Sequence, residues 1–119
     1  EIAVLGATGG RADHMMGNVQ LLFQCLQKGV FAYLADPQNK IYLLDGEREY
    51  QKGQVWGKYI SFLPLTERVY GITLEGFKYP LKDRDIEIGT SLCISNELSE
   101  ERGRITFRDG VLICVEAHD

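Results

Sequence analysis

The hydrophobic period of the chain changes once, at the turn-rich residues 36–39, and this change limits what the chain can fold into. Before it, apolar residues recur at steps of four, three and four, which predicts one amphipathic helix over residues 12–28 with Gly29 as its stop signal. The apolar positions are Met15, Val19, Leu22 and Leu26. After it, no helical period returns, and short apolar runs alternate with polar residues. The sequence therefore predicts one helix followed by a region made of strands.

Two apolar runs, residues 2–5 and 30–35, flank this helix and are typical of buried strands. A single strand–helix–strand unit cannot form a complete α/β layer, because a parallel sheet needs neighbouring strands and cover. The chain also begins, at Glu1, directly before such a strand. We therefore expect a fragment in which residues 1–37 are the C-terminal part of an α/β domain, whose remainder lies upstream or in another chain.

The region after the turn, residues 38–119, is expected to form a second domain of some seven to nine short strands. Residues 105–107 and 111–115 are predicted to pair as a hairpin around Asp109-Gly110. Many short strands with frequent turns are typical of an antiparallel β-sandwich or jelly roll. The predicted fold class is therefore mainly β, with a strand–helix–strand remnant ahead of a sandwich.

The run from Gly89 to Asn96 is predicted to be one of these strands, with two unlike faces. Leu92 and Ile94 are expected to face the core. The opposite face carries Ser91, Cys93 and Ser95. That face either lines a polar pocket or is an ordinary solvated sheet surface, and spacing does not separate the two readings.

A second unusual stretch, Gly76–Leu81, places two aromatic residues and a lysine at a turn. Pro80 restricts Tyr79 to an extended backbone. Tyr79 either stacks on a flat ring of a ligand or is an aromatic residue at the rim of the sandwich, and Trp56 has the same ambiguity.

Composition excludes several classes of protein. With 119 residues, 45% hydrophobic residues and a net charge of −4, the chain can bury a core, and its scattered basic residues argue against nucleic acid or an anionic membrane as partner. No apolar run reaches transmembrane length. The three cysteines are odd in number, far apart and within apolar segments, which predicts buried thiols in a reducing, cytoplasmic compartment rather than a disulfide framework or a zinc site: Cys25, Cys93 and Cys114.

The turn between the first strand and the helix, Gly6–Gly10, leads into Arg11, Asp13 and His14. Its glycines allow a close approach to a ligand, and the free N–H groups of the first helical turn attract an anion. Arg11 carries a planar fork of donors suited to phosphoryl oxygens, while Asp13 can cap the helix or face a metal or a ligand cation. The alternative is an ordinary turn with a capping aspartate, and the spacing matches neither the dinucleotide fingerprint nor a Walker A loop.

Four motifs in order extend over nearly the whole chain: Gly-x-x-Gly-Gly-Arg-x-Asp-His at residues 6–14, Phe-Leu-Pro-Leu at 62–65, Gly-Phe-Lys-Tyr-Pro-Leu at 76–81 and Ile-Ser-Asn-Glu at 94–97. Together they resemble the bacterial thiamin pyrophosphokinase family. The resemblance implies an α/β domain that handles ATP and Mg²⁺, and a C-terminal β-sandwich that helps to bind thiamin. It further implies a homodimer with sites between subunits.

The reaction implied by the resemblance transfers pyrophosphate from ATP to thiamin, giving thiamin diphosphate and AMP. Arg11 and Asp13 are the catalytic candidates, with Asp13 on the side of either the metal or the thiazolium cation. The candidates for substrate binding are Gly9, Gly10, His14, Tyr79, Ser91, Ser95 and Asn96, of which Ser95 and Asn96 lie squarely in a family motif.

The family's aspartate-rich motifs, which carry most of the expected metal ligands, are missing from this sequence. We therefore expect this fragment to be inactive without the upstream α/β domain. The alternative interpretation is a non-catalytic β-sandwich module for ligand binding or dimerisation, because residues 38–119 offer no obvious acid–base pair.

Overall fold

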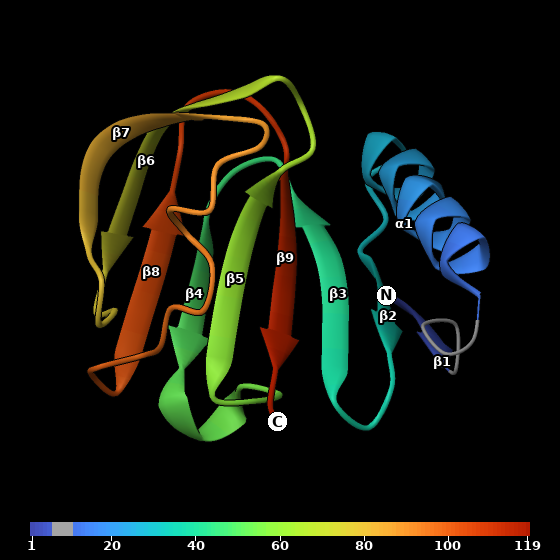
Figure 1. The fold of residues 1–119 in the computed structure, drawn as a ribbon, viewed down its shortest axis with the longest axis horizontal. Coiled ribbons are helices and arrows are strands. Elements are labelled where there is room, and N and C mark those ends of the chain that lie inside the picture. Colours follow the sequence, from blue (N-terminus) through green and yellow to red (C-terminus); the bar gives the residue numbers. More distant parts are fainter. Residues whose placement is uncertain (6–10) are drawn as a thin grey trace.

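The structure, a computed structural model, describes residues 1–5 and 11–119, and these form two packed sheets with one helix outside them (Figure 1). One sheet contains, in spatial order, β1 (Ile2–Leu5), β2 (Ala32–Ala35), β3 (Asn39–Leu44), β9 (Leu112–Ala117) and β5 (Tyr59–Pro64). The other contains β4 (Arg48–Gln51), β8 (Arg102–Thr106), β6 (Arg68–Glu75) and β7 (Leu81–Glu87). The predicted mainly β fold, a sandwich preceded by a strand, a helix and a strand, is confirmed.

The predicted helix is present as α1 (Ala12–Gln27), and Gly29 follows it with φ +72°. Leu22 of α1 is buried against Leu34 of β2 and Leu43 of β3. Neither helical element of the described chain has the length and hydrophobicity that a membrane-spanning helix requires. A short 3₁₀ turn, η1 (Lys52–Gln54), is the other helical element of the described chain.

Strand β3 is buried on both faces because it lies between α1 and the second sheet. Ile41 and Leu43 face the helix, whereas Tyr42 and Leu44 enter the core between the two sheets. Alternate side chains of β3 therefore pack into two separate hydrophobic clusters, one on each face of the sheet. The core between the sheets is completed by Phe62, Ile72, Leu74, Ile105 and Leu112, among others.

The strand–helix–strand unit and the sandwich share one sheet. β1 pairs in parallel with β2, and β2 pairs antiparallel with β3 through the turn at residues 36–39. Asp36 closes this turn, since its Oδ1 accepts the backbone N–H groups of Gln38 (2.8 Å) and Asn39 (2.7 Å). The boundary expected between residues 37 and 38 thus falls between two bonded strands, and the division into domains 1–37 and 38–119 stays a prediction.

The predicted hairpin around Asp109-Gly110 is wrong, because β8 and β9 lie in different sheets. The segment between them crosses from one sheet to the other, with the N–H of Tyr70 donating to Asp109 O and the N–H of Leu65 donating to Val111 O. Local alternation predicts two strands and a turn, but it does not say whether the strands pair with each other. β8 pairs instead with β4 and β6, and β9 pairs with β3 and β5.

The predicted strand over residues 89–96 is also wrong. Turn hydrogen bonds from Thr90 N to Glu87 O and from Ile94 N to Ser91 O bend the segment, so its side chains do not alternate as in a strand. Leu92 and Ile94 are 46% and 45% exposed, whereas Cys93 is buried. The side of the segment that was expected to be polar therefore supplies a core residue.

The predicted burial is confirmed for Cys93 and Cys114, which are free thiols, while Cys25 is partly buried. Burial raises the pKa of the Cys93 and Cys114 thiols.

We expect a thiol reagent at pH 8 to modify one cysteine, Cys25, in the folded protein and the other two on unfolding. Rapid labelling of the folded Cys25→Ser variant would contradict this expectation.

Candidate functional site

The first candidate group lies at the start of α1. Arg11 is the extended residue before the helix, and its Nη2 lies 2.6 Å from Oδ2 of Asp13 in the first turn. Oδ1 of Asp13 accepts the backbone N–H of His14 at 2.9 Å. The side chains of Arg11 and Asp13 are 72% and 60% exposed, so this ion pair contributes little to stability and is accessible to a ligand.

Three predicted residues of this group, Arg11, Asp13 and His14, are thus adjacent and exposed at the positive end of the helix. The capping role considered for Asp13 is not seen at the N-cap, which is Arg11 and has no side-chain cap. Gly9 and Gly10, with the rest of the glycine turn, lie outside the described residues.

The second candidate group is organised by Asn96, which is 2% exposed. Its backbone forms an isolated antiparallel bridge with Ile60 of β5. Its side-chain Oδ1 accepts the backbone N–H groups of Tyr79 (3.0 Å) and Glu97 (2.9 Å), and its Nδ2 donates to Tyr79 O at 2.9 Å. We call this set of bonds the Asn96 clamp.

Tyr79 and Ser95 flank the Asn96 clamp and are exposed. Tyr79 is 56% exposed, with Lys78 Nζ 5.5 Å from the centroid of its ring. Ser95 has φ +60°, and its backbone N–H donates to Ser61 Oγ at 2.9 Å. The structure therefore brings Tyr79, Ser95 and Asn96 together at the edge formed by β5.

Ser91 and Trp56 are placed differently from these three. Ser91 is exposed in the turn that precedes Cys93, outside the Asn96 clamp. Trp56 is tied to the β2–β3 turn, because its indole N–H donates to Asp36 O at 3.2 Å. Direct contact of any of these residues with a ligand stays a prediction.

A pocket of about 460 Å³ lies beside the Asn96 clamp and was not found from the sequence. Glu97 at its wall is flanked by Lys58 (3.8 Å) and Lys78 (3.6 Å). Glu97 could have been found from the sequence, because it belongs to the Ile-Ser-Asn-Glu motif. Lys58 could not, because no motif surrounds it. The lining residues are Lys52, Val55, Gly57, Lys58, Ile60, Glu97 and Leu98.

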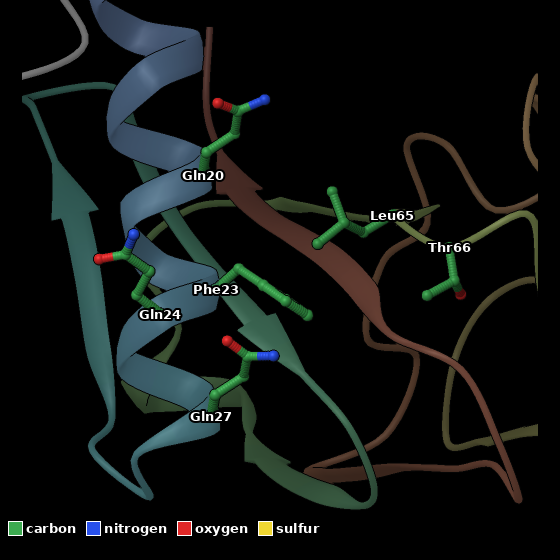
Figure 2. A pocket seen from close by; sticks show the side chains of 6 residues that line it. All are labelled: Gln20, Phe23, Gln24, Gln27, Leu65 and Thr66. Atoms are coloured by element: carbon green, nitrogen blue, oxygen red, sulfur yellow. The ribbon is translucent and has the colours of Figure 1, made fainter.

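A second pocket of about 480 Å³, also missed from the sequence, lies between α1 and the segment after β5. Figure 2 shows Phe23 pointing from the helix toward Leu65, with Gln20 and Gln27 on either side of it. Among the residues that the structure describes, its lining carries amide groups over an apolar floor and no charged side chain: Gln20, Phe23, Gln24, Gln27, Leu65 and Thr66.

Comparison with known proteins identifies the family. Residues 47–112, more than half of the chain, match the family model described as thiamin pyrophosphokinase, vitamin B1 binding domain. The chain belongs to this family. The matched thiamin pyrophosphokinase region contains Tyr79, Ser95 and Asn96 but not the start of α1.

Full-length relatives extend the similarity to the whole chain. Thiamine pyrophosphokinase of Bacillus subtilis is 44% identical over 99% of this chain, which covers 55% of that protein. A crystal structure of thiamine pyrophosphokinase from Bacillus subtilis matches 99% of this chain and 56% of its own, with a TM-score of 0.94 and 42% identity. A crystal structure of thiamin pyrophosphokinase from Geobacillus thermodenitrificans matches 98% of this chain and 54% of its own, with a TM-score of 0.88 and 38% identity. This chain thus spans about half the length of these relatives.

The two candidate groups lie at opposite edges of the five-stranded sheet. α1 begins on the side of β1, whereas the Asn96 clamp is bonded to β5 (Figure 1). Four steps between neighbouring strands, about 4.8 Å each, separate β1 from β5, or about 19 Å in all. One copy of this chain therefore does not bring Arg11 and Tyr79 to the same small ligand.

Proposed function

We propose that this chain supplies the thiamin-binding sandwich of an enzyme that transfers pyrophosphate from ATP to thiamin, giving thiamin diphosphate and AMP. The observation that carries the proposal is the exposed Tyr79, whose backbone is held by the Asn96 clamp beside Ser95 within the matched region. An aromatic face suits the flat pyrimidine of thiamin, and a hydroxyl group suits its polar edge.

The role proposed for the start of α1 is electrostatic. Transfer of a pyrophosphoryl group concentrates negative charge on phosphoryl oxygens, so fixed cationic donors stabilise the transition state. Arg11 offers such donors at the positive end of a helix, and Asp13 orients it through their ion pair. His14 adds a third polar side chain at the same place.

ATP and Mg²⁺ belong to the same proposal. When bound, Mg²⁺ would neutralise charge on the phosphate groups. Within residues 1–5 and 11–119, no three histidine, cysteine or acidic side chains gather as metal ligands, and Asp13 already accepts two bonds. These residues do not by themselves fit a magnesium site, so no step is assigned through the metal.

A homodimer and a cytoplasmic location complete the proposal. Because Arg11 and Tyr79 lie at opposite sheet edges, a second copy is the simplest way to place the helix start of one protomer against the Asn96 clamp of its partner. The free, buried thiols suit a reducing compartment.

The test joins this chain to the half of a thiamin pyrophosphokinase that it does not cover, for example from the Bacillus subtilis relative. The joined protein should release AMP from ATP only when thiamin is present, and this chain alone should release none. If the joined protein binds thiamin but releases no AMP, the catalytic proposal fails and the non-catalytic binding module is favoured.

Tyr79→Ala in the joined protein should weaken thiamin binding by about two- to tenfold, because ring stacking contributes roughly 0.5–1.5 kcal/mol. Titration calorimetry measures the change. Tyr79→Phe, which keeps the ring, should bind within twofold of the parent. Tyr70→Ala, which removes an exposed tyrosine from the other sheet, is the matched control and should leave binding unchanged. Equal affinity of Tyr79→Ala and the parent protein would remove Tyr79 from the site.

A further inference from the structure

We infer that Asn96 is a positioning residue, which acts on thiamin through Tyr79 and makes no contact with the vitamin itself. The inference rests on the proposed function for its ligand, but the clamp it describes is a property of the protein without ligand. It revises the expectation that Asn96 binds substrate directly.

The bonding of the Asn96 amide leaves little for a ligand. A side-chain amide oxygen accepts two hydrogen bonds, and both places are taken by the N–H groups of Tyr79 and Glu97. One of the two N–H groups on Nδ2 donates to Tyr79 O. With Asn96 only 2% exposed, an amino group of a ligand finds neither a free acceptor nor access.

The same bonds fix Tyr79 relative to the sheet. One side chain binds both the N–H and the C=O of Tyr79, as a neighbouring strand would. The backbone of Asn96 is bonded in both directions to Ile60, from Ile60 N to Asn96 O (2.8 Å) and from Asn96 N to Ile60 O (3.0 Å). Tyr79 is therefore tied to β5 through a single residue.

Neighbouring contacts confine the effect of Asn96 to a short segment. Phe77, two residues before Tyr79, is buried and bridged to Leu98, and Lys78 N donates to Glu97 O at 2.8 Å. Pro80 follows Tyr79 and has no N–H group to hold it. Loss of the Asn96 side chain should thus release the backbone of Tyr79 while Phe77 stays anchored in the core.

The decisive experiment is a double-mutant cycle for thiamin affinity in the joined protein, with Asn96→Ala, Tyr79→Ala and the double variant. A positioning role predicts that Asn96→Ala weakens binding by no more than Tyr79→Ala does, and that the double variant binds no more weakly than Tyr79→Ala. The KM for ATP should not change. Two independent, multiplying losses would show a direct contact and overturn the inference.

A measurement without thiamin separates this inference from the proposed function. With fluorotyrosine incorporated and the Tyr79 signal assigned by Tyr79→Phe, the ¹⁹F resonance of Tyr79 should shift or broaden in an Asn96 variant. If Asn96→Ala does not fold, Asn96→Asp serves, because it keeps both acceptor bonds and replaces the bond donated to Tyr79 O by repulsion between two oxygen atoms. An unchanged Tyr79 resonance overturns the inference. Failure of the parent to bind thiamin, with a shifted resonance, overturns the proposed function alone.

Discussion

Arg11→Ala in the joined protein is expected to lower kcat by about a thousandfold, the scale seen when an arginine that stabilises a transferring phosphoryl group is removed. The thiamin affinity should change little, because the role proposed for Arg11 is to bind phosphoryl oxygens and not the vitamin. The melting temperature should also be unchanged, since the Arg11 side chain is 72% exposed and its ion pair with Asp13 is at the surface. AMP release under saturating substrates measures the effect.

Two variants sharpen this test. Arg11→Lys keeps the charge but loses the planar fork of donors, so it should recover only part of the lost rate. Arg104→Ala removes another exposed arginine that is paired with a carboxylate, that of Glu47, on the second sheet, and it should retain full activity. A loss below tenfold for Arg11→Ala would show that Arg11 does not contact the transferring group.

Gly76→Ala is expected to lower the free energy of unfolding by roughly 3 kcal/mol or more, or to prevent folding. Gly76 has φ +80°, and a Cβ atom there would lie 2.1 Å from the backbone oxygen of Arg102. The backbone at Gly76 cannot easily shift to relieve this strain, because Gly76 O accepts the N–H groups of Ser99 (2.9 Å) and Glu100 (3.3 Å). Chemical denaturation of the parent and variant chains measures the difference.

Two other glycines separate the backbone cost from the steric cost. Gly89 has φ +96° but open space where a Cβ would lie. Gly89→Ala should therefore lower the free energy of unfolding by about 1–2 kcal/mol, from the unfavourable backbone conformation alone. Gly46 has neither a left-handed φ nor a close neighbour, and Gly46→Ala should be nearly neutral. If Gly76→Ala costs no more than Gly89→Ala, the close approach of β8 to Gly76 is not a constraint.

Part of the candidate site was accessible from sequence. The order of motifs pointed to Arg11, Asp13, Tyr79 and Asn96, and the structure gathers these into two groups. Sequence reasoning placed Asn96 among the substrate-binding candidates, and that contact stays a prediction. The hydrogen bonds that its side chain makes with Tyr79 and Glu97 are visible only in the structure. The pocket beside Glu97 was missed, since its lysines come from a loop about 40 residues earlier in the chain and carry no local pattern.

The sequence by itself determined the helix, its glycine stop and the strand-rich sandwich, because these depend on periods of 3.6 and 2 within short windows. Tertiary structure decided which strands pair. The alternation around Asp109-Gly110 is the same for a hairpin and for a crossing between sheets, and only contacts of β8 with β4 and of β9 with β3 distinguish them. Likewise, only the tertiary structure shows that Asn96 is buried and hydrogen-bonded to Ile60 and Tyr79, which lie 36 and 17 residues earlier in the chain. No local sequence pattern encodes hydrogen bonds at that separation.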